Sequence, residues 1–355
     1  MPSFSIKPPS DYSLARDVCS YGYFLLAPNR WNVKDQSLSR ALMLDKEIVG
    51  IVISQPKGSG NPLRVGLDRA LSANMKSHAE AQIRRMLRLD EDESHVREFH
   101  KVDPRWKRTG RARLFRSPSL FEDVLKTVTS CNVTWPGTVH MNRRLCDVVG
   151  RSSPSGLLTF PTPQALARTR PETLRSRCRV GYRDLRIIEL SRMFAKRDPE
   201  VRIIEDPNTP DDLLHETLLS LPGVGPYAAA NIMQLLGRYS RLPLDTESVR
   251  HGRSVLGYKG SSKQIMRRVK DHFAPFESHA FRSYWFEMWV HYEKLQGPAN
   301  TWERDTTGTM FTASQLKKLA EAAGHKPPKL PKPPRPSKPN ASAEGRAPIR
   351  SVIRK

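Results

Sequence analysis

A short turn punctuated by glycine and proline constrains this chain more than any other stretch of its sequence. Residues 221–225 read Leu-Pro-Gly-Val-Gly, and Pro226 follows at once. Apolar residues recur at helical spacing on both sides, over residues 209–221 and 226–238. Proline suits the first position of a helix, and glycine adopts positive φ angles that other residues avoid. The stretch therefore predicts two helices joined by one tight hairpin.

This hairpin is a candidate anion-binding site. The amides of Gly223, Gly225 and Tyr227 are expected at the start of the second helix, where unpaired N–H groups and the helix dipole attract anions. Leu221 and Val224 complete the turn, and its carbonyl groups are candidate ligands for a monovalent cation. A DNA phosphate fits this site, and contact through backbone amides carries no sequence information. Taken alone, the turn is equally compatible with an ordinary pair of core helices.

The charge of the chain also indicates a polyanionic partner. Its 355 residues contain 59 Lys and Arg against 36 Asp and Glu, which gives a net charge of +23. Residues 326–355 carry nine basic residues and one acid, so +15 remains on the rest of the chain. Nucleic acid is favoured over a membrane surface because no basic amphipathic anchor is evident. We expect double-stranded DNA as the partner, with general solubility as the alternative explanation.

Cysteine spacing and hydropathy exclude several other classes. The four cysteines are far apart and form no Cys-x-x-Cys pair, so neither a zinc ribbon nor an iron–sulfur cluster has a ligand set. No apolar run reaches the roughly 18 residues of a membrane helix, and the first residues do not resemble a secretory signal. We therefore expect no cofactor, no firm metal site and no membrane association. A monomer is expected in the nucleoid or cytoplasm, or in the nucleus of a eukaryote.

The chain divides into three regions by pattern. Residues 37–55 and the turn that follows are typical of paired strands, and residues 72–92 of an amphipathic helix. From residue 119 onward helical spacing dominates, and the Pro- and Lys-rich end predicts disorder. We expect an α+β protein: a β-rich domain over 1–105, a helical domain over 106–305 and a basic tail over 306–355.

One isolated acid adds a chemical signal to the hairpin. Asp245 follows the turn by about twenty residues, just behind Pro243 and at the start of another predicted helix. By itself Asp245 is explained as a helix N-cap. The combined pattern LPGVGPY…LPLDTESVRH, however, resembles the helix–hairpin–helix, Gly/Pro-rich loop and aspartate motif of the endonuclease III superfamily of DNA glycosylases.

The resemblance extends over roughly residues 1–302. PPSDYSLARDV near the start is similar to bacterial 3-methyladenine DNA glycosylase II, and FPTPQALA and VGYRDLRIIELSRMF are similar to that enzyme and to 8-oxoguanine DNA glycosylase. It implies an N-terminal antiparallel β-sheet domain with a helix, followed by an all-α, two-lobed helix–hairpin–helix glycosylase domain.

The resemblance also implies a reaction. Asp245 matches the catalytic aspartate, whose carboxylate stabilises the oxocarbenium charge that develops on the sugar as the base leaves. Near a helix N-terminus this carboxylate is expected to stay ionised. Members that also cut the strand carry a lysine two residues after the second turn glycine, where this chain has Tyr227. A phenol cannot form the required Schiff base, so the resemblance implies a monofunctional enzyme.

Two further sets of residues follow from the resemblance. The base pocket is expected to include Tyr227, Trp285 and Phe286, because electron-poor alkylated purines stack well on aromatic rings. The gap left by an everted base is expected to be filled by Asn132, with Tyr182 as a wedge and Arg183 contacting the orphaned base. The alternatives are a core stripe for the aromatic residues, and a helix cap and solvated loop for the others.

Three functions remain from the sequence. The first is a monofunctional DNA glycosylase of base excision repair that removes an alkylated or oxidised purine with an aspartate-assisted water. The second is a non-catalytic DNA-binding protein that retains the scaffold. The third is a lyase or nuclease that uses the same hairpin. Asp245 favours the first over the second, and Tyr227 argues against the third.

Overall fold

The computed structural model describes residues 2–306, so all but the first residue of the predicted tail over 306–355 lies outside the described residues. An antiparallel sheet with strand order β1-β5-β4-β3-β2 comes first. Its strands are β1 (Ser3–Ile6), β2 (Arg30–Asn32), β3 (Ser37–Leu44), β4 (Glu47–Ser54) and β5 (Leu63–Leu67). The predicted strands over residues 37–55 are confirmed as the β3–β4 hairpin, in which Leu38 pairs with Ile53.

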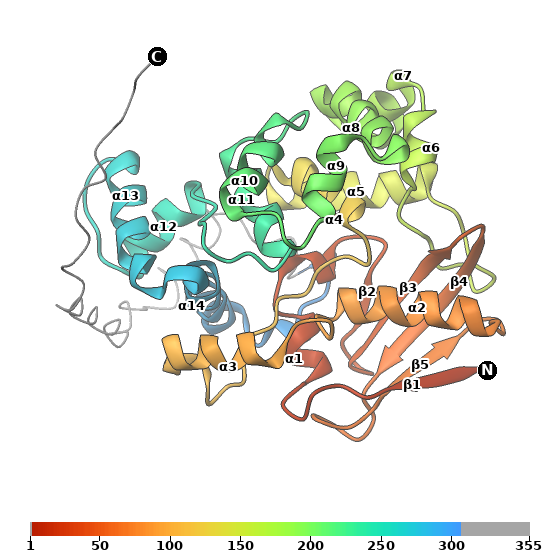
Figure 1. The fold of residues 1–355 in the computed structure, drawn as a ribbon, viewed down its shortest axis with the longest axis horizontal. Coiled ribbons are helices and arrows are strands. Elements are labelled where there is room, and N and C mark those ends of the chain that lie inside the picture. Colours follow the sequence, from red (N-terminus) through yellow and green to blue (C-terminus); the bar gives the residue numbers. More distant parts are fainter. Residues whose placement is uncertain (1, 307–355) are drawn as a thin grey trace, which may run out of the picture.

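Helix α2 (Ala73–Met86) crosses the sheet and packs against β3 (Figure 1). Ser72 caps it by accepting a hydrogen bond from the amide of Met75. Its apolar residues Ala79, Ile83 and Met86 recur at helical spacing and are buried. The amphipathic helix expected from residues 72–92 is confirmed, and with the sheet it forms the predicted α+β first region.

The remaining described residues are mainly helical. Short helices near the start are α1 (Leu14–Val18) and η1 (Gly22–Leu25), and α3 (Glu93–Val102) and η2 (Pro104–Trp106) follow α2. Figure 1 shows α4 to α11 gathered above the sheet and α12 to α14 beside it. The helices above the sheet are α4 (Leu120–Ser130), α5 (Trp135–Val149), α6 (Pro163–Ala167), α7 (Pro171–Thr173), η3 (Leu174–Cys178), η4 (Gly181–Arg183), α8 (Asp184–Lys196), α9 (Pro199–Glu205), α10 (Asp211–Ser220) and α11 (Pro226–Leu235). Those beside it are α12 (Thr246–Ser254), α13 (Ser262–Phe273), η5 (Ala274–His279), α14 (Ala280–Gln296) and η6 (Ala299–Thr301).

Buried apolar side chains form two separate clusters, which divide the helices into two lobes. One cluster joins the sheet to the last helices, for example Leu38 and Ile51 with Phe273 and Trp289. The other lies within the segment from α4 to α11, with Ala27 added from the N-terminal region. The two-lobed arrangement of the helices is thus present, and the second lobe shares its core with the sheet. The domain boundary near residue 105 stays a prediction.

A cluster of buried charged side chains connects the sheet to helix α4. The Arg40 guanidinium on β3 donates to both carboxylate oxygens of Glu122 on α4, at 3.0 and 2.8 Å. Lys126 Nζ lies 2.7 Å from Glu122 Oε1, one turn along the same helix. The three side chains are at most 3% exposed. Burial acts to raise the pKa of Glu122, but the two cations outweigh it and hold that pKa at about 2.

Candidate active site

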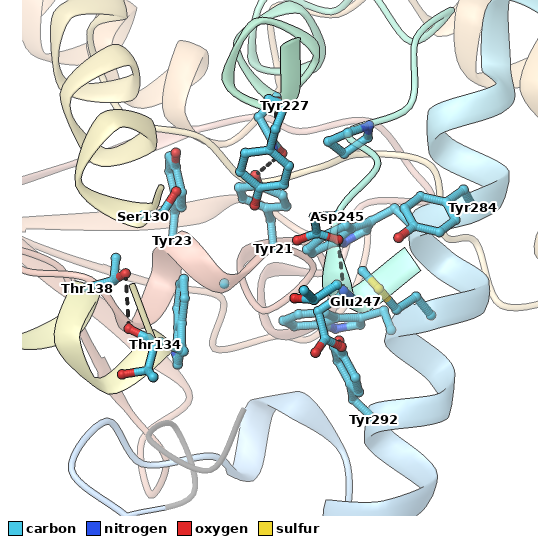
Figure 2. A pocket seen from close by; sticks show the side chains of 18 of the residues that line it. Tyr21, Tyr23, Ser130, Thr134, Thr138, Tyr227, Asp245, Glu247, Tyr284 and Tyr292 are labelled. Atoms are coloured by element: carbon cyan, nitrogen blue, oxygen red, sulfur yellow. Dashed lines mark hydrogen bonds between the residues drawn. The ribbon is translucent and has the colours of Figure 1, made fainter. Parts of the chain in front are cut away.

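One pocket of about 320 Å³ opens between the two lobes. Five segments enclose it: the start of η1, the α4–α5 turn, α11, the start of α12, and α14. Figure 2 shows side chains from these segments surrounding the same space. Its wall contains eight aromatic residues, Tyr21, Tyr23, Trp135, Tyr227, Tyr284, Trp285, Trp289 and Tyr292, and two acids, Asp245 and Glu247. No lysine, arginine or histidine of the described chain lines it.

Asp245 lies at the N-terminus of α12. One of its carboxylate oxygens accepts hydrogen bonds from this helix, and the other is available. Its Oδ1 accepts hydrogen bonds from the amides of Glu247 at 3.0 Å and Ser248 at 3.1 Å. The Ser248 hydroxyl accepts from the Asp245 amide, which completes a capping box, and lies 2.9 Å from the Tyr284 hydroxyl. Oδ2 accepts no hydrogen bond from the described residues. The N-cap role and the pocket role of Asp245 are therefore compatible.

The environment of this carboxylate changes its acidity. Burial, aided by the negative charge of Glu247, raises the pKa of Asp245 to about 6, although the capping N–H groups act to lower it. The expected ionised state holds at neutral pH, where a group with this pKa is mostly deprotonated. The sequence-based reason was incomplete: the helix N-terminus favours the anion, but removal from water has the larger effect.

Tyr227 faces Asp245 across the pocket, at the position where the resemblance marks a lysine. Its backbone carbonyl accepts from the side chain of Asn231, which in turn accepts from the Tyr21 hydroxyl at 3.0 Å. Burial and the nearby Asp245 charge raise the pKa of the Tyr227 phenol well above its ordinary value. Tyr227 is therefore a neutral aromatic wall of the pocket.

The tryptophans of α14 form another wall. Trp285 and Trp289 stack on each other with ring centroids 5.4 Å apart, and both line the pocket. Their indole N–H groups donate to the carbonyls of Ser20 and Cys19, which fixes both rings. The prediction of Phe286 as a pocket residue is wrong. Phe286 is fully buried against Phe99 and Trp106, because consecutive residues of a helix point about 100° apart.

The hairpin over residues 221–225 joins α10 to α11 as predicted. Leu221 and Val224 are buried in the α4 to α11 cluster and anchor the turn. Gly223 has φ +81°, so it uses the conformational freedom expected of glycine. Gly225, the N-cap of α11, has φ −103°, so only the first of the two turn glycines uses a positive φ. A Cβ at residue 225 would meet no atom within 4 Å, so the space beside this residue is open.

The three predicted gap residues lie together beside the pocket. Asn132 stands in the α4–α5 turn with φ 51°, and its amide lies 3.4 Å from the Tyr182 hydroxyl. Tyr182 is 55% exposed. Arg183 is buried and donates to carbonyl oxygens of Cys131, Val180 and Asn132, so it holds this turn in place. The contact of Arg183 with an orphaned base stays a prediction. It would require the guanidinium to break its hydrogen bonds to these carbonyl oxygens.

Sequence reasoning missed several residues of the pocket wall, among them Tyr21, Tyr23, Glu247 and Tyr292. Tyr21 and Tyr23 come from the N-terminal region, more than 200 residues before Asp245, so no local pattern connects them. Trp135 is a pocket candidate from the sequence on the same aromatic argument as Trp285, and it lines the pocket. Glu247 had a signal as well, since it lies two residues beyond Asp245 at the exposed start of a predicted helix.

Within residues 2–306, no group of three or more His, Cys, Asp or Glu side chains could hold a metal ion. The four cysteines are unpaired, and burial raises the pKa of the Cys131 thiol to about 11. No helix in this part of the chain is long and apolar enough to cross a membrane.

Comparison with solved structures shows what the chain is similar to. A 3-methyladenine DNA glycosylase from Archaeoglobus fulgidus aligns with TM-score 0.61 and 19% identity, over 82% of this chain and 98% of that chain. The 8-oxoguanine glycosylase/lyase of Clostridium acetobutylicum aligns with TM-score 0.60 and 16% identity, over 81% and 96%. Its complex with double-stranded DNA containing cytosine opposite 8-oxoguanine aligns with TM-score 0.55 and 16% identity, over 76% and 92%.

These similarities show that the chain has the fold of DNA glycosylases, which confirms the fold expected from its hairpin and aspartate. No family model matches the chain, and no curated protein sequence matches it.

Proposed function

We propose that this protein is a monofunctional DNA glycosylase that everts a damaged purine and hydrolyses its glycosidic bond. One observation carries the proposal. At the start of α12, Asp245 holds one carboxylate oxygen in a capping box and leaves the other available in an aromatic pocket, whose wall includes Tyr227 from the first turn of α11. A purine stacked in this pocket would bring its sugar to the carboxylate.

The carboxylate suits the expected transition state. As the bond between C1′ and the base nitrogen breaks, positive charge develops on the sugar, and the fixed anion of Asp245 stabilises it without reorganising. The base leaves with the bonding electron pair, and a water molecule then adds to C1′ and gives its proton to the Asp245 carboxylate. The product is an abasic site. Low polarity around the carboxylate, visible in its raised pKa, strengthens this interaction.

Tyr227 supports a monofunctional reaction. Strand cleavage through a Schiff base needs an amine that can attack C1′. The pocket wall presents a phenol at the relevant position, and no lysine of the described chain lines it. Water is therefore the nucleophile in this proposal. The alternative is a DNA-binding protein without activity.

An alkylated purine fits the pocket better than an oxidised one. Alkylation at a ring nitrogen leaves the base with a positive charge, whereas an oxidised guanine is neutral. Aromatic faces attract cations, and this wall combines eight aromatic rings with two acids and no basic side chain. In a chain with net charge +23, such a pocket favours a cationic base.

Duplexes that each carry one lesion test the function directly. Incubation followed by gel analysis, with and without hot alkali, separates the candidates. We expect strand breaks only after alkali, and more of them for alkylated than for oxidised purines. Breaks without alkali would support a lyase, and no breaks on any lesion would support a non-catalytic binder.

The rate of base excision should fall in mild acid. Protonation of Asp245, with its pKa of about 6, removes the anion that stabilises the sugar cation. The surrounding phenols of Tyr21, Tyr227 and Tyr284 have raised pKa values and stay neutral throughout this range. The single-turnover rate should be halved near pH 6 and fall to about a tenth at pH 5. A rate that does not change between pH 5 and 8 would exclude Asp245 as the essential anion.

Two glycine substitutions should separate folding from DNA contact. Gly223→Ala places a Cβ 3.0 Å from the Arg186 side chain at a positive φ, which should cost about 1 to 2 kcal/mol of stability. Gly225→Ala meets open space at an ordinary φ, so stability should change by less than about 1 kcal/mol. If a phosphate approaches residue 225, DNA affinity should nevertheless fall about tenfold. Unchanged affinity in Gly225→Ala, measured by anisotropy titration, would argue against the hairpin as the phosphate site.

A further inference from the structure

The pocket contains a second carboxylate that the reaction does not need. Glu247 lies two residues beyond Asp245, in the first turn of α12, and lines the same wall (Figure 2). Its side chain is 24% exposed. An acid in an aromatic pocket, beside a like charge, is unfavourable unless a cation or hydrogen bonds compensate it.

The position of this carboxylate is fixed. Glu247 Oε2 accepts from Arg250 Nε at 2.8 Å and from the Tyr292 hydroxyl at 2.5 Å. Arg250 is buried and does not line the pocket, so it supports the carboxylate from behind. Oε1 accepts no hydrogen bond from the described residues. The geometry therefore presents one free carboxylate oxygen to a ligand, with the partner cation on the far side.

We propose that Glu247 is a specificity-determining residue that makes the pocket prefer positively charged purines over neutral purines of the same shape. This inference rests on the proposed function, because it assigns the site a base as its ligand. A cationic base gains from the anion of Glu247 as well as from the ring faces, whereas a neutral base gains only from stacking. Asp245 acts on the sugar, and Glu247 acts on the base.

Binding of isolated bases tests this without any reaction. The probes are the 3,9-dimethyladeninium cation and its neutral isostere 3,9-dimethyl-3-deazaadenine, titrated at pH 7.5. Pocket tryptophans Trp135, Trp285 and Trp289 report binding through their fluorescence. The wild-type protein should bind the cation about tenfold more tightly than the neutral base or better. Glu247→Gln should lose most of this preference, while Glu247→Asp, which keeps the charge, should retain it.

The matched control is Glu216→Gln, which makes the same change at an exposed position on α10. It should leave the preference unaltered. A structural role for Glu247 would weaken both ligands equally in the Gln and Asp variants, and that result would overturn the proposal. So would a wild-type protein that does not distinguish the two bases.

A kinetic readout separates this inference from the proposed function. Glu247→Gln removes a like charge beside Asp245, so the acid limb of the excision profile should move to lower pH. A wild-type protein that prefers the cation yet excises no lesion would contradict the proposed function and support the role of Glu247. If the protein excises lesions but Glu247→Gln changes neither the preference for the cationic base nor the pH profile, the proposed function is supported and the role of Glu247 is contradicted.

Discussion

Asp245→Asn should lower the single-turnover rate of base excision by about 10²- to 10³-fold. The amide has the size of the carboxylate but no charge to stabilise the cationic sugar. DNA affinity should stay within about threefold of wild type, because the hairpin and the α4–α5 turn are untouched. The rate is measured with enzyme in excess over a lesion-bearing duplex.

The same substitution should not weaken the fold. Asparagine caps helices as well as aspartate does. Because the folded protein raises the pKa of Asp245 to about 6, the folded state binds its proton more tightly than the unfolded state does. This group therefore lowers stability as pH rises from about 4 to about 6, by up to about 3 kcal/mol. At pH 7.5 the Asn variant should melt at the wild-type temperature or above it.

Asp212→Asn is the matched control, since Asp212 is an exposed first-turn acid of α10 that pairs with Arg241. It should change neither excision nor stability by a measurable amount. An Asp245→Asn variant that excises as fast as this control would show that Asp245 is only a helix cap.

Glu122→Gln should destabilise the protein by about 3 to 5 kcal/mol. Glu122 is the one acid between Arg40 and Lys126, and all three side chains are buried. Its removal leaves two cations in the interior with a neutral amide between them. The lowered pKa of Glu122 gives the sign of the pH effect: its stabilisation is present above about pH 4.5 and is lost as pH falls toward 2.

Lys126→Met tests the same cluster from its other side. It leaves the two hydrogen bonds from Arg40 to Glu122 in place and removes a cation whose own pKa is lowered by burial. Its cost should therefore be clearly smaller than that of Glu122→Gln. Urea unfolding midpoints at constant slope provide the comparison. The opposite ranking would mean that Lys126 is the essential partner.

The fold and the centre of the candidate site could be predicted because both follow from local patterns in the sequence. The strands, the amphipathic helix α2 and the α10–α11 hairpin each follow from periodicity and turn residues within a short window. Asp245 is marked by its place between a proline and a helix start. The structure adds that its cap uses only one oxygen of the carboxylate.

The rest of the site depends on contacts between distant segments. Tyr21 and Tyr23 reach the pocket only because the sheet shares a core with α14. Phe286 and Trp285 are neighbours in sequence, and only the packing of α14 decides which ring faces the pocket. A Glu and a Lys one helical turn apart, such as Glu122 and Lys126, are typical of a solvent-exposed helix face. Their burial is tolerated because Arg40 on strand β3 pairs with Glu122.

The proposed role of Asp245 is to stabilise positive charge at C1′ of an everted nucleotide. Its most direct test is the affinity for duplexes that carry either a cationic pyrrolidine abasic analogue or its neutral tetrahydrofuran counterpart. We predict that the wild-type protein binds the cationic duplex about 100-fold more tightly, and that Asp245→Asn binds the two alike. Equal affinity of the wild-type protein for both duplexes would contradict the account.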